Sequence, residues 1–242
     1  MPLTKSKGNM YDWVTHTHTH LGGECPHKCS YCYVQAMAKR FPVMKERYTG
    51  KIRIIEKEMD VKYGTGKTIF IEHLNDLWAN GVPDKFVNMV LGHCSVWPDN
   101  TYVFQTKNPY RYMDFIHRMP PRRILGCTIE SSDDEQTARI SDTPMPHARY
   151  SEMRNLRLQG ERLFITIEPI LDGNMLKLAN YIKGIDPEFV NIGADSKGGN
   201  LNEPTAEQII ELIELLNHYG VTIRRKTSLS RILGDKELPN AE

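Results

Sequence analysis

Short apolar runs rich in β-branched and aromatic residues alternate with amphipathic stretches along most of the sequence. The apolar runs are bounded by Gly, Pro or Asn and predict strands at residues 13–19, 68–72, 101–105, 124–129, 163–167, 189–192 and 221–224. The stretches between them predict helices at residues 33–40, 83–93, 109–119, 144–159, 175–182 and 204–219. This alternation is typical of a parallel sheet, because parallel neighbours need a long crossover connection.

Six or seven strand–helix units in 242 residues fit a single domain spanning residues 1–242. We therefore predict an α/β fold, a partial parallel (β/α)6-type barrel, with a doubly wound open sheet as the alternative. In either fold, functional side chains are expected at the carboxyl ends of the strands.

The composition argues against a membrane or export setting. A net charge of +1 gives no overall attraction to nucleic acid or lipid, so any phosphate binding would need a local basic patch. No apolar run approaches the length of a membrane span, and the first ten residues lack the apolar core of a signal peptide. We expect a cytoplasmic protein with no membrane partner.

Three of the five cysteines, Cys25, Cys29 and Cys32, lie within eight residues, directly after the first predicted strand. An odd, clustered set predicts a metal site rather than disulfides. Three thiolates leave one iron of a 4Fe–4S cluster free for another ligand, and the preceding glycines would let the backbone wrap closely around it. A structural zinc site using His27 or His20 is the alternative, although zinc modules usually pair cysteines in two knuckles.

The segment GGECPHKCSYCY resembles the signature of radical S-adenosylmethionine (SAM) enzymes, including an aromatic residue, Tyr31, before the third cysteine. The chain is also similar to the phage-type Gp37/Gp68 (DUF5131-like) family through NMYDWVTHTHTHLGGECPHKCSYCY, IFIEHLNDLW, VFQTKNPYR, LGCTIES, FITIEPIL, VNIGADS and TSLSRIL. The resemblance implies a 4Fe–4S cluster that binds SAM and, with an external one-electron reductant, cleaves it to a 5′-deoxyadenosyl radical. That radical would take hydrogen from a substrate, while the protein positions the substrate and excludes water.

Polar side chains follow several predicted strands, where the resemblance implies cofactor and substrate contacts. Asn75 and Asp76 would bind the SAM amino group, although capping of a helix is an equal alternative. The other expected cofactor contacts are Tyr31, Thr128, Glu130, Ser131 and Asn191, and the expected catalytic residues are Glu168, Lys107 and His20.

A run of alternating histidines, His16, His18 and His20, lies on one face of the first predicted strand. This face could bind a metal, but we favour a polar barrel interior beside the active site. His20 is the histidine of this run nearest the cysteines and is expected to contact substrate or the cluster.

The expected substrate is a nucleotide, free or within DNA, because the resemblance is to a phage-type family and two basic clusters occur at residues 122–123 and 224–226. A peptide or another small molecule is the alternative, as is a non-catalytic iron–sulfur or zinc protein. Residues 64–68, GTGKT, lack the first glycine and the strand-to-helix setting of a P-loop, so we do not predict nucleoside-triphosphate binding there.

Overall fold

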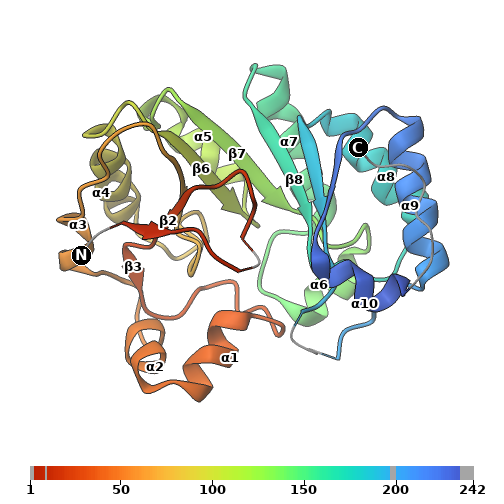
Figure 1. Ribbon diagram of the computed structural model, residues 1–242, viewed down its shortest axis with the longest axis horizontal. Helices are drawn as coiled ribbons and strands as arrows, with labels where there is room; N and C mark the ends of the chain where they lie inside the picture. The colour runs from red at the N-terminus through yellow and green to blue at the C-terminus, as the bar shows by residue number, and fades with distance from the viewer. Residues whose placement is uncertain (1–2, 9, 197–199, 235–242) are drawn as a thin grey trace. The chain divides into compact units, whose positions relative to one another are not determined.

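The computed structural model describes residues 3–8, 10–196 and 200–234, and the chain divides into two compact units, residues 1–125 and 126–242 (Figure 1). The first unit contains strands in the order β1 (Thr4–Lys5), β2 (His16–His18), β5 (Thr68–Ile71) and β6 (Thr101–Thr106). β1 is antiparallel to β2, whereas β2, β5 and β6 are parallel. A separate antiparallel pair consists of β3 (Leu21–Gly22) and β4 (Arg53–Ile54).

The helices of the first unit follow its strands in sequence. They are α1 (Tyr33–Arg40), α2 (Pro42–Tyr48), α3 (Glu56–Met59), α4 (Asp84–Ser95), α5 (Tyr110–Phe115) and the 3₁₀ turn η1 (Ile116–Arg118). α1 and α2 contact each other.

The second unit repeats the strand–helix alternation. Its strands run in the order β7 (Arg123–Thr128, which begins just before the unit boundary), β8 (Leu163–Ile167), β9 (Phe189–Ile192) and β10 (Ile223–Arg225), and β8, β9 and β10 are parallel. The helical elements are α6 (Asp134–Ile140), α7 (Pro146–Leu158), α8 (Met175–Ile185), α9 (Ala206–His218), η2 (Thr227–Leu229) and α10 (Ser230–Leu233). α8 contacts both α7 and α9 (Figure 1).

Helix α9 shows how local sequence specifies an element here. Thr205 and Gln208 form a capping box that satisfies backbone groups at its first turn. Its apolar stripe is buried through Ile209, Leu212, Ile213 and Leu216. Truncating one of the buried leucines to alanine would cost about 2–5 kcal/mol of stability.

Strand β8 is buried at every residue, as expected for a parallel strand covered on both faces. It packs against β7 through a close approach at Gly126, where an added Cβ would lie 2.1 Å from the ring of Phe164. The Phe164 ring in turn stacks on Phe189 of β9, with centroids 5.5 Å apart. Gly126 is therefore needed to make room for an aromatic layer.

Each predicted strand and helix is present, which confirms the α/β class, although boundaries shift by a few residues. The predicted helix at 109–119 is wrong in one respect, since it ends early and continues as the 3₁₀ turn η1. The elements between residues 42 and 59, and helix α6, were not predicted. The single domain spanning 1–242 stays a prediction. Within the described residues, no helix combines the length and apolar character that crossing a membrane requires.

Candidate functional site

The cysteine loop, residues 23–32, connects β3 to α1 and turns at both gaps between its cysteines. The backbone N–H of Lys28 donates to the carbonyl of Cys25 at 3.3 Å, and that of Cys32 donates to the carbonyl of Cys29 at 3.0 Å. Cys32 then precedes the first residue of α1, and its carbonyl accepts the N–H of Ala36 at 3.1 Å. The three cysteines are partly buried in this loop.

Gly23 opens the loop with a φ of 91°, which favours glycine. An added Cβ would lie 2.3 Å from the carbonyl oxygen of Lys51. The Gly23 N–H also donates to the carbonyl of Arg47 at 2.8 Å. The sequence analysis attributed the glycines to close wrapping of a cluster, but at Gly23 the close neighbour is the protein's own backbone after α2.

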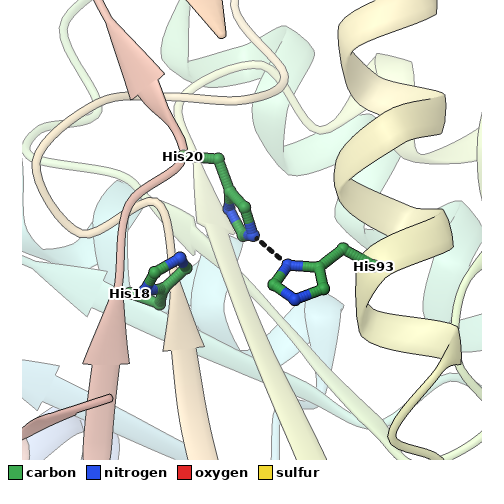
Figure 2. Close-up of side chains that lie close together, drawn as sticks. All are labelled: His18, His20 and His93. Carbon is green, nitrogen blue, oxygen red and sulfur yellow. Dashed lines mark hydrogen bonds between the residues drawn. The ribbon is translucent and has the colours of Figure 1, made fainter. Parts of the chain in front are cut away.

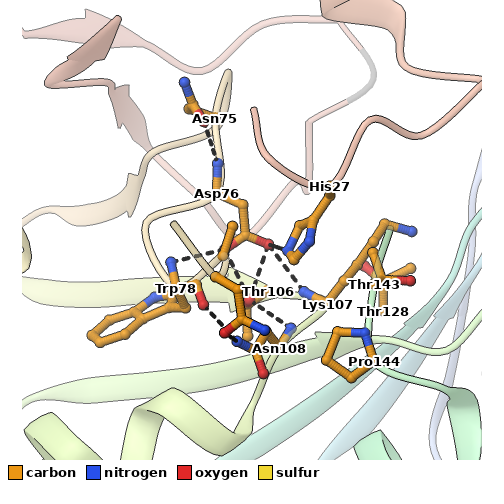
Figure 3. Close-up of polar contacts among 12 residues, drawn as sticks. His27, Asn75, Asp76, Trp78, Thr106, Lys107, Asn108, Thr128, Thr143 and Pro144 are labelled. Carbon is orange, nitrogen blue, oxygen red and sulfur yellow. Dashed lines mark hydrogen bonds and ion pairs between the residues drawn. The ribbon is translucent and has the colours of Figure 1, made fainter. Parts of the chain in front are cut away.

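The carboxylate of Asp76 is buried and saturated with hydrogen bonds (Figure 3). It accepts from Nε2 of His27 at 2.9 Å, the N–H of Lys107 at 3.0 Å, the hydroxyl of Thr106 at 2.8 Å and the N–H of Trp78 at 2.9 Å. Burial alone would raise the pKa of this carboxyl, but His27 and the donated hydrogen bonds hold its pKa below its usual range. Asp76 therefore joins the cysteine loop to the end of β6, and its predicted contact with SAM stays a prediction.

Three other predicted residues also lie at this loop. The side-chain amide of Asn75 donates to the carbonyl of Gly23 at 3.2 Å, at the start of the loop. Nζ of Lys107 donates to the hydroxyl of Tyr31 and lies 4.9 Å from the centre of that ring. The structure thus places Asn75 and Lys107 against the cysteine loop, which contains Tyr31, and the cofactor and catalytic roles of these three residues stay predictions.

The spacing of the thiols is informative about the group they fit. Four ligands around one zinc ion lie about 3.8 Å apart for Zn–S bonds of about 2.3 Å. Among the described residues, the group of three whose ligand atoms all lie within 4.8 Å of one another is His18, His20 and His93, and the cysteines form no such group. Both the iron–sulfur cluster and the alternative zinc site at the cysteines therefore stay predictions.

His18 and His20 are buried together with His93 of α4, while His16 is only partly buried and lies outside this group (Figure 2). Nε2 of His20 lies 2.9 Å from Nδ1 of His93. The other ring nitrogen of His20, Nδ1, lies 2.7 Å from a carboxylate oxygen of Glu72. The sequence analysis missed His93, which no motif marks. His20 is completely buried in this polar group, and its expected contact with substrate or the cluster stays a prediction.

The other five predicted residues, Thr128, Glu130, Ser131, Glu168 and Asn191, lie in the second unit. Glu130 is completely buried, and one of its carboxylate oxygens is 2.5 Å from Nη1 of Arg149, also completely buried. The same guanidinium donates to the carbonyl of Thr128 at 2.9 Å. Arg149 was not predicted, because a single arginine on a helix carries no signal of a buried partner.

Glu168, at the end of β8, pairs with Lys226 after β10 at 2.8 Å. Ser131 accepts the N–H of Asp133 at 3.0 Å, so it has the turn role that competes with a cofactor contact. Asn191 is buried at 2% exposure. The cofactor and catalytic roles of these residues stay predictions.

A model of a protein family described as "Protein of unknown function (DUF5131)" matches residues 9–213. The chain belongs to the DUF5131 family. A search of curated proteins finds no match.

Several solved structures resemble this DUF5131 protein. A spore photoproduct lyase mutant with bound AdoMet and dinucleoside spore photoproduct matches with a TM-score of 0.57 at 12% identity, covering 94% of this chain and 76% of the other. Streptococcus suis SuiB bound to S-adenosylmethionine matches with a TM-score of 0.58 at 9% identity, covering 92% of this chain and 53% of SuiB. These likenesses confirm the predicted fold, a partial parallel barrel of the radical SAM kind.

Proposed function

We propose that this DUF5131 protein is a cytoplasmic radical SAM enzyme whose Cys25, Cys29 and Cys32 bind a 4Fe–4S cluster. The observation that carries the proposal is the C-x3-C-x2-C loop, which follows the first parallel strand of a fold shared with SAM-bound structures. Three cysteines would leave one iron available to SAM. We also propose that the chain is related to the phage-type Gp37/Gp68 proteins that its sequence resembles.

The residues around the loop would then hold it in one shape. Asp76 fixes His27, which lies between Cys25 and Cys29, and Asn75 fixes the start of the loop at Gly23. When bound and reduced by an external donor, the cluster would supply one electron to SAM and so start hydrogen abstraction from a substrate. The chain's own contribution is positioning and exclusion of water.

The remaining predicted residues divide between SAM and substrate. We assign Tyr31 and Asn75 to the SAM methionine moiety near the cysteine loop. Asp76 would act at the same place through the hydrogen bonds by which it holds the loop. Lys107, Glu168 and His20 are assigned to the substrate. The strand-end residues of the second unit assigned to the nucleoside part of SAM are Thr128, Glu130, Ser131 and Asn191.

The proposed substrate is a nucleotide, alone or in DNA. The likeness to a lyase structure that contains a dinucleoside photoproduct supports this class, as do the basic residues 224–226. A free nucleotide or a single strand is favoured over duplex DNA, because flipping a base out of a duplex costs a few kcal/mol.

Anaerobic reconstitution tests the cluster and SAM together. The protein should take up about four irons per chain, develop iron–sulfur absorbance and release 5′-deoxyadenosine when SAM and dithionite are added. Cys29→Ala should lose all three properties, whereas Cys94→Ala and Cys127→Ala, at buried cysteines outside the loop, should keep them. A fully loaded cluster in Cys29→Ala would refute the assignment.

The substrate class has a separate test. Nucleotides and oligonucleotides deuterated at carbon would be incubated with the reduced enzyme and SAM, and deuterium in 5′-deoxyadenosine would be measured by mass spectrometry. Transfer from a nucleotide supports the proposal. Transfer from a deuterated peptide, with none from any nucleotide or DNA, overturns it and leaves the cluster assignment standing.

A further inference from the structure

Three histidines of the first unit meet away from the cysteine loop. His18 ends β2, His20 follows it and His93 lies on α4, and one ring nitrogen of each lies within 4.8 Å of the others (Figure 2). Their exposed fractions are 5%, 0% and 9%. Three imidazoles that share one buried volume need an explanation, because each must satisfy two polar ring nitrogens without water.

Two of these rings have a ring nitrogen whose hydrogen can be assigned from its neighbour. Nε2 of His93 lies 2.9 Å from the carbonyl oxygen of Val61, and Nε2 of His18 lies 3.1 Å from that of Glu58. A carbonyl oxygen only accepts, so each Nε2 is the donor. In a neutral ring, Nδ1 of His18 and Nδ1 of His93 therefore each present a lone pair.

The third ring has the same arrangement with its nitrogens exchanged. Nδ1 of His20 lies 2.7 Å from Oε1 of Glu72, whose carboxylate oxygens also accept the backbone N–H groups of His20 and Leu21. Beside an ionised Glu72, Nδ1 of His20 is the donor and Nε2 presents the lone pair. That nitrogen is 2.9 Å from Nδ1 of His93, so with an ionised Glu72 two lone pairs face each other, and a cation held between the rings would satisfy both.

We infer that His18, His20 and His93 bind a divalent cation of the zinc class. Imidazole nitrogens suit zinc and its first-row neighbours rather than magnesium or calcium. Each ring also donates its other N–H to a carbonyl or a carboxylate, which is the arrangement that orients metal-binding histidines. This site goes beyond the proposed function and uses none of the cysteines, but it takes His20 as a ligand, so His20 would then hold the ion in place of its assigned contact with substrate.

The present spacing is close to what such an ion needs. Tetrahedral ligands with Zn–N bonds of about 2.0–2.1 Å lie about 3.3 Å apart. The three nitrogens already lie within 4.8 Å of one another, so small rotations of the rings suffice. The buried hydroxyl of Tyr63 lies 2.9 Å from Nε2 of His20 and borders the site. Because all three histidines are buried, we take the ion to be a structural one.

The ion would connect three segments that are distant in sequence: the end of β2, the stretch that contains Tyr63, and α4. His20 is five residues before Cys25, so the ion would anchor the chain just before the cysteine loop. A proton on Glu72 would satisfy the same pair of nitrogens without a metal. The two arrangements differ in metal content, which can be measured directly.

The first test uses the wild-type protein, purified without air from zinc-supplemented medium. Zinc and iron per chain would be measured by mass spectrometry, and the zinc ligands by X-ray absorption at the zinc edge. We expect about one zinc per chain whatever the iron content, with nitrogen or oxygen neighbours at about 2.0–2.1 Å. Absence of zinc, or sulfur neighbours at about 2.3 Å, overturns the inference, and neither result bears on iron binding by the cysteines.

The second test uses matched variants. His93→Gln should lower zinc affinity at least a hundredfold. Glu72→Gln keeps the shape of the side chain but weakens the acceptor of the His20 ring, and should lower zinc affinity about 10–100-fold. His16→Gln, in the same run of histidines but outside the group, should retain wild-type zinc. Unchanged zinc affinity in folded His93→Gln would refute the site, and if that variant does not fold, the wild-type absorption spectrum decides.

Discussion

Nε2 of His27 lies 2.9 Å from Oδ2 of Asp76, which joins the middle of the cysteine loop to a carboxylate held by residues at the end of β6. A loop between two short elements is thereby tied to the parallel strands. The contact explains how a segment of ten residues with no regular structure of its own keeps one shape.

Asp76→Asn should weaken the hold on the loop without unfolding the protein. An amide has one acceptor oxygen where the carboxylate has two, so a buried donor is left without its partner, at a cost of about 1–3 kcal/mol. We expect faster loss of iron from the reconstituted protein, followed with a coloured chelator. Asp114→Asn, at an exposed position on α5, is the matched control. Equal rates of iron loss in the two variants would contradict the prediction.

Glu130→Ala should destabilise the second unit, because it removes the carboxylate that pairs with the charge of the completely buried Arg149. Removing one partner of a buried ion pair costs about 3–5 kcal/mol, measurable by urea unfolding. Glu135→Ala removes the partner of Arg139 in an exposed pair, and it should cost at most about 1 kcal/mol. If Glu130→Ala instead lowers SAM affinity and leaves stability unchanged, the residue acts mainly on the cofactor.

His73 should lower the free energy of unfolding as the pH decreases. Burial lowers its pKa to about 4, from 6.5 for an ordinary histidine. Between pH 6.5 and about pH 4, His73 is protonated in the unfolded chain but neutral in the folded chain, so protonation favours unfolding. The protein therefore has its full stability with respect to His73 above pH 6.5 and loses stability as the pH falls below that value. The free energy of unfolding should drop by up to about 1.4 kcal/mol per pH unit from this group alone.

The His73 contribution is isolated by comparing wild type with His73→Gln. Urea unfolding at several pH values between 7.5 and 4.5 should give a difference between the two proteins that shrinks steadily as the pH falls. A difference that does not depend on pH would show that His73 does not titrate differently in the two states.

Arg225 is the basic residue of the 224–226 cluster best placed to meet a phosphate. The guanidinium of Arg224 lies 3.9 Å above the ring of Phe189 and Lys226 pairs with Glu168, whereas Arg225 is exposed. The sequence analysis treated the three as one patch.

Arg225→Gln should reduce the slope of log affinity against log salt by about 0.7 for a single-stranded oligonucleotide, the value for one lost phosphate contact. Fluorescence anisotropy over a range of salt concentrations measures that slope. Arg139→Gln, on α6 and equally exposed, should leave it unchanged. Equal slopes in wild type and Arg225→Gln would argue against a nucleic-acid contact at this position.

Much of the fold could be predicted from the sequence because its central strands, such as β8 and β9, are buried at every residue. The runs at 163–167 and 189–192 are short and mostly apolar, and β8 and β9 have those same bounds. The elements between residues 42 and 59 could not be predicted. Helices of seven and four residues have little intrinsic stability, so their formation depends on packing that local sequence does not encode.

The candidate site was only partly predictable for a related reason. Cys25, Cys29 and Cys32 are close in sequence, so their spacing is itself the signal. His93 and Arg149 contact partners that are distant in sequence: His93 contacts His20, 73 residues away, and Arg149 contacts Glu130, 19 residues away. No local sequence pattern reveals such contacts. Asp76 was identified from its place after β5, but its hydrogen-bond partners depend on how neighbouring strands end.

The close contact at Gly23 has a consequence for protein engineering. The start of the cysteine loop is hydrogen-bonded to the backbone carbonyls of Arg47 and Gly50, at the end of α2 and just after it. Backbone contacts accept many side chains but fix the number of residues between them. The exposed residues in the segment 47–50 should therefore tolerate substitution, but this segment should reject insertions or deletions, so an affinity tag or a reporter peptide placed there would disturb the cysteines more than one placed on a distant loop.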